Sequence, residues 1–400
     1  MNRRFLLVIV TVLVVLASIV VVVRIAGGRG STGALGGTSP TDGRPASGTP
    51  IPNCQTRSQQ VKDAKGNVFV RLDATSPDDV WAVGAHYLGG KGVPFSARWN
   101  GDAWQPVDVP DDNRLAELQD VVAISPADAW AVGAWSDNQT MIYHWNGSRW
   151  KIVASPNFIG DLNELMGVDA SPSGDVWAVG KGSVDTARRY RTLIEHLESG
   201  SWHLVPSPNL GTDDNVLRDV VVISPGDVWA VGWRMSPGTH YRTLVEHWNG
   251  SSWKIIPSPN PGLDSYLSGV AAAGPRDIWT VGWSGDGPDR SKALTMHWNG
   301  RRWQVVGAPV TSTTETHLED VAIGSAGIFA VGQTADDAST FRTLVLRFDR
   351  SGWIRIPSEN GGSTHSFLSG AVVTGDQLFA GGTHVSDTGG YGAHVEHGCS

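Results

Sequence analysis

The chain has few charged residues and no excess of basic ones. Only 18% of its 400 residues are Asp, Glu, Lys or Arg, and 31 basic residues stand against 39 acidic ones, a formal net charge of −8. A nucleic-acid partner requires a basic face, so this balance argues against one. Glycine, by contrast, is abundant at 49 residues. A weakly charged, glycine-rich chain is typical of a turn-rich all-β protein.

Cysteine is nearly absent as well. The two cysteines are Cys54 and Cys399, and none lies between residues 55 and 398. The sequence contains no constellation of residues with the spacing of a catalytic or metal site. We therefore expect no metal, no cofactor and no catalytic residue.

Tryptophan is the residue in which the chain is rich, and a repeat accounts for it. Of the 18 tryptophans, only Trp135, Trp233 and Trp283 fall outside three periodic rows. The sequence Trp-Ala-Val-Gly, or a close variant, starts at Trp81, Trp130, Trp177, Trp229, Trp279, Phe329 and Phe379. The intervals are 49, 47, 52, 50, 50 and 50 residues. A fixed period of this size indicates a repeat architecture.

Each repeat has the pattern of four short strands. In the fourth, β-branched and aromatic runs cover Leu217 to Ser224, Val228 to Trp233, Thr243 to Trp248 and Trp253 to Ile256. Asn249-Gly250 is a strong hairpin signal between the last two. Four strands joined by turns make one antiparallel blade. Seven copies predict an all-β, seven-bladed β-propeller over residues 54–400.

The N-terminus has the pattern of a membrane anchor. Phe5 to Val23 is 19 residues without a charge, Pro or Gly, long enough to span a bilayer as a helix. We expect residues 1–26 to be a cytoplasmic stub and signal anchor. Residues 27–53 are rich in Gly, Ser, Thr and Pro and predict a disordered linker. The propeller then lies on the extracytoplasmic side of the cell membrane; a cleaved signal peptide is the alternative.

The seventh repeat stops before its fourth strand. The chain ends at Ser400, and Gln55 to Lys62 is the unassigned segment that can supply the missing outer strand. Cys399 stands where other blades carry the Asn of the Asn-Gly turn, and Cys54 precedes the closing strand. We predict a disulfide between them, which implies an oxidising compartment. Two free buried thiols are the alternative.

Two polar positions recur from blade to blade. An Asp precedes the tryptophan motif, and a His occupies one position of the third strand. They are Asp79, Asp128, Asp175, Asp227 and Asp277, and His144, His196, His247, His297 and His397. A catalytic or metal site is made once, whereas these groups recur around a ring. We expect them to tie turns together as satisfied polar pairs.

The motifs carry a family resemblance. Ser-Pro-x-Asp-Val-Trp-Ala-Val-Gly followed by His-Trp-Asn-Gly-Ser-x-Trp resembles bacterial exported propellers of the kelch and galactose-oxidase-like superfamily, over about residues 55 to 399. The kelch double glycine occurs only at Gly381-Gly382. Galactose oxidase needs a Tyr–Cys crosslink and copper ligands, and no Cys lies between residues 55 and 398, so the resemblance does not imply its activity. The Ser-x-Asp pattern is also similar to the Asp-box of sialidases, which is a structural turn.

The loops point to one working face. The turns between the first and second and between the third and fourth strands are short and uniform, whereas the other two connections vary. Variable loops on a rigid scaffold usually carry function. The candidate ligand-binding residues there are Trp135, Arg188, Arg189, Tyr190, Arg191, His240, Tyr241, Arg242, Phe341 and Arg342.

Two function classes fit this face. Aromatic residues mixed with Arg suit a protein or carbohydrate of the cell envelope, so the first hypothesis is a non-enzymatic binding module. The second is an envelope carbohydrate-active hydrolase or lyase that uses carboxylates at the mouth of the ring. A pair of carboxylates about 5–9 Å apart in a pocket would favour the enzyme.

Overall fold

The fold was analysed in a computed structural model. It describes residues 56–88, 91–110, 114–158, 160, 162–183, 189–236, 240–286, 291–309, 315–337, 340–360, 365–385 and 391–398. The predicted anchor and linker, and both cysteines, lie outside these ranges. Within them, no helix has the length and apolar character needed to cross a membrane.

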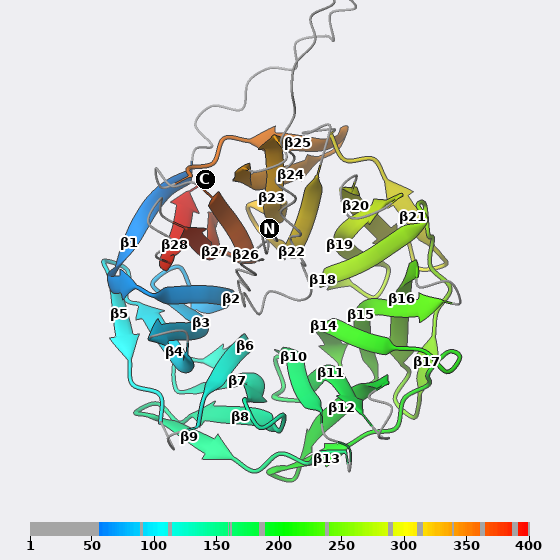
Figure 1. Cartoon of the computed structure of the whole chain (residues 1–400), viewed down its shortest axis with the longest axis horizontal. Helices are drawn as coiled ribbons and strands as arrows, with labels where there is room; N and C mark the ends of the chain where they lie inside the picture. Colours follow the sequence, from blue (N-terminus) through cyan, green and yellow to red (C-terminus); the bar gives the residue numbers. More distant parts are fainter. Residues whose placement is uncertain are drawn as a thin grey trace, which may run out of the picture. The chain divides into compact units, whose positions relative to one another are not determined.

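Seven four-stranded antiparallel sheets surround one axis, as the repeat predicts (Figure 1). We number these blades 1 to 7 along the chain and name their strands a to d from the axis outwards. Blade 1 consists of β2 (Asn67–Ser76), β3 (Asp79–Leu88), β4 (Lys91–Trp99) and β5 (Trp104–Val107). Blade 2 consists of β6 (Ala116–Ser125), β7 (Asp128–Trp135), β8 (Thr140–Trp145) and β9 (Trp150–Val153). Blade 3 consists of β10 (Asn163–Ala170), β11 (Val176–Ser183), β12 (Tyr190–Glu198) and β13 (Ser201–Leu204).

The next three blades repeat this order. Blade 4 consists of β14 (Asn215–Ser224), β15 (Asp227–Ser236), β16 (His240–Trp248) and β17 (Trp253–Ile255). Blade 5 consists of β18 (Asp264–Gly274), β19 (Asp277–Gly285), β20 (Ser291–Trp298) and β21 (Trp303–Val306). Blade 6 consists of β22 (Thr316–Gly324), β23 (Gly327–Asp337), β24 (Thr340–Asp349) and β25 (Gly352–Ile356).

Blade 7 joins the two ends of the domain. It contains β26 (His365–Thr374), β27 (Gln377–Val385) and β28 (Tyr391–Gly398), and its outer strand is β1 (Thr56–Lys65). β1 pairs antiparallel with β28, with Thr56 opposite Gly398 (Figure 1). The predicted closing strand is therefore confirmed. β1 covers the outer edge of β28, which an incomplete last blade would leave unpaired.

The tryptophan rows pack one blade against the next. The Trp81 ring of blade 1 lies 5.0 Å from both Trp145 and Trp150 of blade 2, measured between ring centroids. The same contact closes the circle, because Phe379 of blade 7 lies 6.3 Å from Trp99 of blade 1. Aromatic pairs of this kind add about 0.5–1.5 kcal/mol each beyond the area that they bury. The hydrophobic core is thus a ring of clusters between blades.

The glycine that ends each motif is required by a close backbone approach. A Cβ on Gly133 would lie 2.0 Å from the carbonyl oxygen of Glu117 on the neighbouring strand a. Strand a carries a β-bulge at this point, where the register shifts between Leu118 and Asp120. Other blades shift in the same place. A bulge re-aims side chains, and here it sets the residues that line the axis.

Candidate functional site

The two faces of the ring differ in how strictly they repeat. On the turn face, formed by the a–b and c–d turns, His247 Nε2 lies 2.8 Å from Asp227 Oδ1. The His247 ring stacks on Trp229 at 4.2 Å, and the Trp229 indole N–H donates to Asp227 at 2.8 Å. The three side chains form a clasp within one blade. These contacts are the ties that the repeating Asp and His positions predict.

The clasp has variants around the ring. His144, His196 and His297 reach Asp128, Asp175 and Asp277 at 2.9, 2.7 and 2.8 Å. His397 reaches Gln377 at 2.8 Å. In blade 1 an Arg replaces the His, and Arg98 pairs with Asp79. Among the described residues, no group of three or more His, Cys, Asp or Glu is arranged to hold a metal ion.

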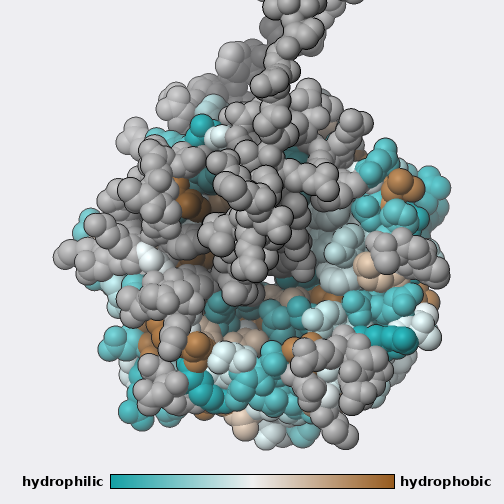
Figure 2. Space-filling model, in the orientation of Figure 1, coloured by the Kyte–Doolittle hydropathy of each residue, from teal (hydrophilic) through white to brown (hydrophobic). Residues whose placement is uncertain are grey.

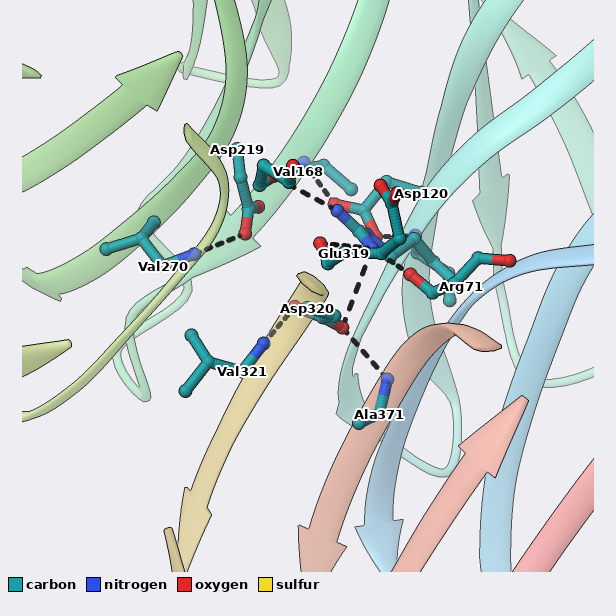
Figure 3. Close-up of polar contacts among 12 residues, drawn as sticks. Arg71, Asp120, Val168, Asp219, Val270, Glu319, Asp320, Val321 and Ala371 are labelled. Atoms are coloured by element: carbon teal, nitrogen blue, oxygen red, sulfur yellow. Dashed lines mark hydrogen bonds and ion pairs between the residues drawn. The ribbon is translucent and has the colours of Figure 1, made fainter. Parts of the chain in front are cut away.

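A ring of charged and glycine residues surrounds the axis. It occupies the position after the bulge in strand a of every blade, and Figure 3 labels its charged members. From blade 1 to blade 7 the residues are Arg71, Asp120, Gly167, Asp219, Gly269, Asp320 and Gly370. Asp and Gly alternate over six blades. We call this set the axial ring.

Each axial Asp joins its blade to the next one. Asp219 accepts the backbone N–H of Val220 in its own blade at 2.9 Å and that of Val270 in blade 5 at 2.8 Å (Figure 3). Asp120 and Asp320 repeat this arrangement with Val168 and Ala371. The carboxylates therefore satisfy buried backbone donors between blades.

The next blade leaves no room for a side chain at the glycine positions Gly167 and Gly269 of the axial ring. A Cβ on Gly167 would lie 2.8 Å from the Cα of Asp219, and one on Gly269 would lie 2.9 Å from the Cα of Asp320. A blade that follows an Asp blade therefore cannot carry a side chain here, because the next Asp blade lies too close. Alternation over an odd number of blades leaves one blade unmatched, and that blade carries Arg71.

Arg71 connects blade 1 to other blades around the axis. Its guanidinium donates to the carbonyl oxygens of Ser268, Glu319 and Ser369, the bulge residues of blades 5, 6 and 7 (Figure 3). Its Nη1 also lies 3.7 Å from Asp320 Oδ2. One side chain thus ties blade 1 to three others.

Burial and mutual charge set the protonation of the axial ring. Burial raises the pKa of Asp219 to about 6 against the opposing effect of Arg71. Burial raises the pKa of Asp120 and Asp320 as well. Burial alone would lower the pKa of Arg71, but the negative charges of Asp320, Asp219 and Asp120 raise it above its ordinary value. Arg71 is therefore a permanent cation among carboxyl groups that hold their protons more tightly than usual.

The layer next to the axial ring, on the side of the b–c and d–a loops, does not repeat. In each blade it comprises the bulge residue, the strand-a residue two places before it, and the strand-b residue paired with the latter; we call it the mouth layer. Blades 3 to 7 contribute Met166, Glu164 and Lys181; Arg218, Val216 and Trp233; Ser268, Tyr266 and Trp283; Glu319, His317 and Gln333; and Ser369, Phe367 and Thr383.

Aromatic rings in the mouth layer stack on one another in blades 4 to 6. Tyr266 lies between Trp233 and Trp283, with ring centroids 5.9 and 5.6 Å away and interplanar angles of 26° and 9°. His317 continues the stack 5.3 Å beyond Trp283. Tyr241, near the start of β16, meets the edges of the three central rings at 5.0–6.0 Å. We call these five residues the aromatic cluster.

Burial shapes the chemistry of this cluster. It raises the pKa of Tyr266 to about 12, with the Arg218 charge acting in the opposite direction. It lowers the pKa of His317 to about 4. His317 Nε2 lies 2.5 Å from Ser291 Oγ. Both are buried, at 6% and 2% exposure, so this Ser–His pair is a satisfied interior hydrogen bond and not an accessible nucleophile with its base.

The predicted aromatic site residues are distributed around the loop face. Tyr241 belongs to the aromatic cluster. Tyr190 lies under Lys181, whose Nζ is 4.8 Å from the ring centroid. Trp135 is buried in blade 2 beneath Arg114, and Phe341 packs against His365 and Phe367 in blades 6 and 7. The structure therefore brings Tyr190 and Tyr241 together, because both pack against the cluster that contains Trp233 and Tyr266, and it leaves Trp135 and Phe341 apart from them.

The predicted basic site residues mostly support loops. Arg191 donates to the carbonyls of Gly211, Thr212 and Asp213, and Arg189 also donates to that of Thr212. Arg242 donates to the carbonyl of Gly262 in the equivalent d–a loop.

The other predicted basic positions vary. His240 lies 3.4 Å from Asp264. Arg342 is half-buried in β24, opposite Thr334. Arg188 lies outside the described residues. None of these contacts tests ligand binding.

Sequence reasoning missed the core of the aromatic cluster. Trp233 and Trp283 directly follow the motif glycine, and they are two of the three tryptophans that fit no periodic row. A tryptophan that departs from the repeat is not needed by the blade, and that was the available signal. The axial ring had a signal too, because Leu-x-Asp or Leu-x-Gly stands in strand a of blades 2 to 7.

Comparisons with known proteins support the fold and nothing finer. No family model and no curated relative matches the sequence. A protein of unknown function from Dyadobacter fermentans DSM 18053 resembles it at a TM-score of 0.50 and 10% identity, covering 88% of this chain and 100% of that one. The extracellular domain of the hybrid two-component system BT4673 from B. thetaiotaomicron matches at a TM-score of 0.51 and 12% identity. That match covers 86% of this chain and 40% of the other.

Proposed function

We propose that the protein is a non-enzymatic binding module whose ligand, a protein or glycan of the cell envelope, contacts the loop face at the aromatic cluster. The observation that carries this proposal is the break in the repeat. The turn face carries the same clasp in blade after blade, whereas Trp233, Tyr266 and Trp283 gather in blades 4 and 5 alone. A group shared by most blades serves the blade, and one confined to two blades is free to serve a ligand.

The chemistry of the cluster suits recognition. Tyr241 and Trp283 are half-buried, so each presents part of a rigid ring to the surface while the rest is held by its neighbours. Leu210 and Leu263, which are 40% and 50% exposed, lie in the d–a loops that precede blades 4 and 5. Figure 2 shows small hydrophobic patches among hydrophilic surface on the face that it views. Rigid aromatic side chains bind with little loss of conformational entropy.

Two described carboxylates of the mouth layer are engaged by neighbouring side chains, whereas a hydrolase would need them free to act on the substrate. Glu164 lies 3.0 Å from Lys181 Nζ, and Glu319 accepts a hydrogen bond from Gln333 at 3.1 Å. A glycoside hydrolase needs one carboxyl poised as an acid and a second facing the sugar. The engaged state of these groups supports binding over hydrolysis.

The propeller type, the membrane anchor and the topology are proposed from the sequence. We place the protein among exported kelch-like propellers, held in the cell membrane by Phe5 to Val23, with residues 27–53 as tether and the propeller outside. External protease added to spheroplasts should degrade the propeller. Its protection would reverse the topology, and mature protein that begins after residue 26 would show a cleaved signal.

The binding proposal is tested by a screen of the full chain in detergent against envelope glycans and extracted envelope proteins. The wild type is compared with a Tyr241→Ala/Trp283→Ala double variant. His297→Ala, at the turn face of the same blade as Trp283, is the matched control for loss of stability. We expect at least one ligand that the wild type and control retain and the double variant loses. Equal retention by all three proteins would contradict the proposal.

A further inference from the structure

Some of the buried polar atoms that have no hydrogen-bond partner among the described residues lie in one part of the mouth layer, while others include indole nitrogens of the tryptophan rows and the carboxylate of Glu246. Arg218 Nε, Ser268 Oγ, Gln333 Oε1 and Thr383 Oγ1 accept or donate no hydrogen bond among the described residues. They come from the consecutive blades 4, 5, 6 and 7 and occupy the same layer. Buried polar groups are normally paired, so a run of unpaired ones in adjoining blades calls for a physical cause.

Arg218 is the strongest of these signals. Its residue is 9% exposed, and the contact that the guanidinium makes is from Nη1 to the Met166 sulfur at 3.5 Å. A thioether is a weak acceptor, whereas a guanidinium has five donors. Removing a cation from water is unfavourable unless an anion with suitable geometry faces it.

The carboxyl groups around Arg218 do not supply that anion. Asp219, the next residue, accepts the backbone N–H groups of Val220 and Val270. Glu319 lies within electrostatic range of Arg218 and is hydrogen-bonded to Gln333. Burial raises the pKa of Glu319 despite the opposing charge of Arg218. The guanidinium therefore retains donors for an external acceptor.

The surroundings define the chemistry of the acceptor. The planar fork of Arg matches a carboxylate, which takes two parallel hydrogen bonds. Tyr266 and Trp233 adjoin Arg218 through the cluster that includes Met166. The Ser268 hydroxyl and the Gln333 amide oxygen can pair with ligand hydroxyls. A ring that carries one carboxylate and several hydroxyls, next to aromatic side chains, is an acidic sugar.

We propose that the mouth layer of blades 4 to 6 binds a carboxylated sugar, such as a uronic acid unit of an envelope glycan. Arg218 pairs with the carboxylate, and Ser268 and Gln333 contact the hydroxyls. This assignment rests on the proposed binding function and specifies its ligand class. A phosphate dianion fits less well because Glu319 and Asp219 lie beside a single guanidinium.

The test measures binding by isothermal titration with the full chain in detergent. The probes are a glucuronic acid tetrasaccharide, its carboxyl-reduced glucose counterpart, inorganic phosphate and a short peptide with a free C-terminal carboxylate. We expect the acidic tetrasaccharide to bind at least about tenfold more tightly than the reduced one, since one good charged contact is worth about that ratio.

The variants separate Arg218 from other arginines of the propeller. Arg218→Met should abolish the preference for the acidic probe, and Arg98→Met, which removes the half-buried Arg paired with Asp79 on the turn face, should keep it. Gln333→Leu is a second variant in case Arg218→Met does not fold, and it should weaken binding of the acidic probe several-fold. Thermal unfolding of each variant checks the fold.

The outcomes distinguish the two proposals. If both tetrasaccharides bind equally and Arg218→Met changes neither, the acidic-sugar assignment is wrong while the binding function stands. Preference for the peptide or for phosphate also overturns the assignment. If none of the probes binds but the envelope screen finds a partner at the aromatic cluster, the ligand class is wrong. If the screen finds nothing either, the proposed function fails as well.

Discussion

Arg71 Nη1 lies 3.7 Å from Asp320 Oδ2 at the axis of the ring, in a layer where both residues are more than nine-tenths buried. Arg71 belongs to blade 1, the blade that the alternation of Asp and Gly leaves unmatched, and the pair places its positive charge beside the carboxyl group of Asp320. It connects the first blade to the sixth, while backbone contacts connect it to the fifth and seventh. The stability of the closed ring therefore depends on this residue.

Replacing Arg71 should destabilise the propeller strongly. Arg71→Met removes the hydrogen bonds to three blades and leaves the axial carboxylates without a counter-charge. We expect a loss of about 3–5 kcal/mol in the free energy of unfolding, the usual result of breaking a buried ion pair from one side. Chemical denaturation measures it.

Two further variants test whether the loss of stability in Arg71→Met comes from the loss of its buried charge. Arg98→Met removes the half-exposed Arg of the blade 1 clasp and should cost less. Adding Asp320→Asn to Arg71→Met should recover part of the loss, because it removes one uncompensated charge. A double variant no more stable than Arg71→Met alone would contradict the role assigned to charge.

The buried carboxyls predict a pH dependence of stability. Burial raises the pKa of Asp169 to about 8 and that of Asp73 to about 6, from an ordinary value of 3.8. The folded protein therefore holds protons that the unfolded chain releases between pH 4 and 8. The contribution of these groups is complete below pH 4 and is lost as the pH rises through 6 and then 8.

Asp169→Asn isolates one such group. Asn can still accept the backbone N–H of Val222, which Asp169 accepts at 2.6 Å, but it does not titrate. Between pH 4 and 8 the wild type should lose about 1.4 kcal/mol per pH unit relative to this variant. Denaturation curves at several pH values measure the difference. Parallel pH profiles would show that Asp169 titrates at an ordinary pKa.

The clasp should be structural. His247→Ala removes the partner of Asp227 and the ring that stacks on Trp229, and we expect a loss of about 1–3 kcal/mol in unfolding free energy. Ligand binding at the opposite face should be unchanged. A variant that keeps its stability and loses binding would place a functional site on the turn face.

Cys54 and Cys399 should be joined by a disulfide. The pairing of Thr56 with Gly398 brings the described ends of β1 and β28 together, and both cysteines lie within two residues of that pair. A crosslink that closes so long a loop can contribute about 4–5 kcal/mol in the chain-entropy model. Mass spectrometry of non-reduced peptides from protein isolated from its native compartment should find the linked peptides, and Cys399→Ala should lower the melting temperature without changing the fold. Two free thiols would contradict this prediction.

The fold could be predicted because its signals are local. Trp-Ala-Val-Gly, the Asn-Gly turns and the strand patterns each lie within one repeat, and copy number alone then gives the seven blades. The closing strand followed from the missing fourth strand of the last repeat. Each inference needed only residues near one another in the sequence, plus a count.

The axial ring and the aromatic cluster were harder to predict because they depend on contacts between blades. Asp219 and Gly167 are 52 residues apart, and their relation appears only once blades 3 and 4 face each other. Tyr241 and Phe341 look equivalent in sequence, yet only Tyr241 meets Trp233 and Trp283. Arg191 and Arg242 looked free for a ligand, but they donate to loop carbonyls.

Hydroxyl-radical footprinting locates the bound ligand on one of the two faces of the ring. The full chain is labelled with and without the envelope ligand that binds best in the screen, and the oxidation of each tryptophan is compared. Trp283 and Trp298 belong to the same blade, are both half-buried, and lie toward opposite faces. We predict that the ligand protects Trp283 and Tyr241 and leaves Trp298 and Trp248 unchanged. Protection of Trp298 and Trp248 with no change at Trp283 would contradict the account.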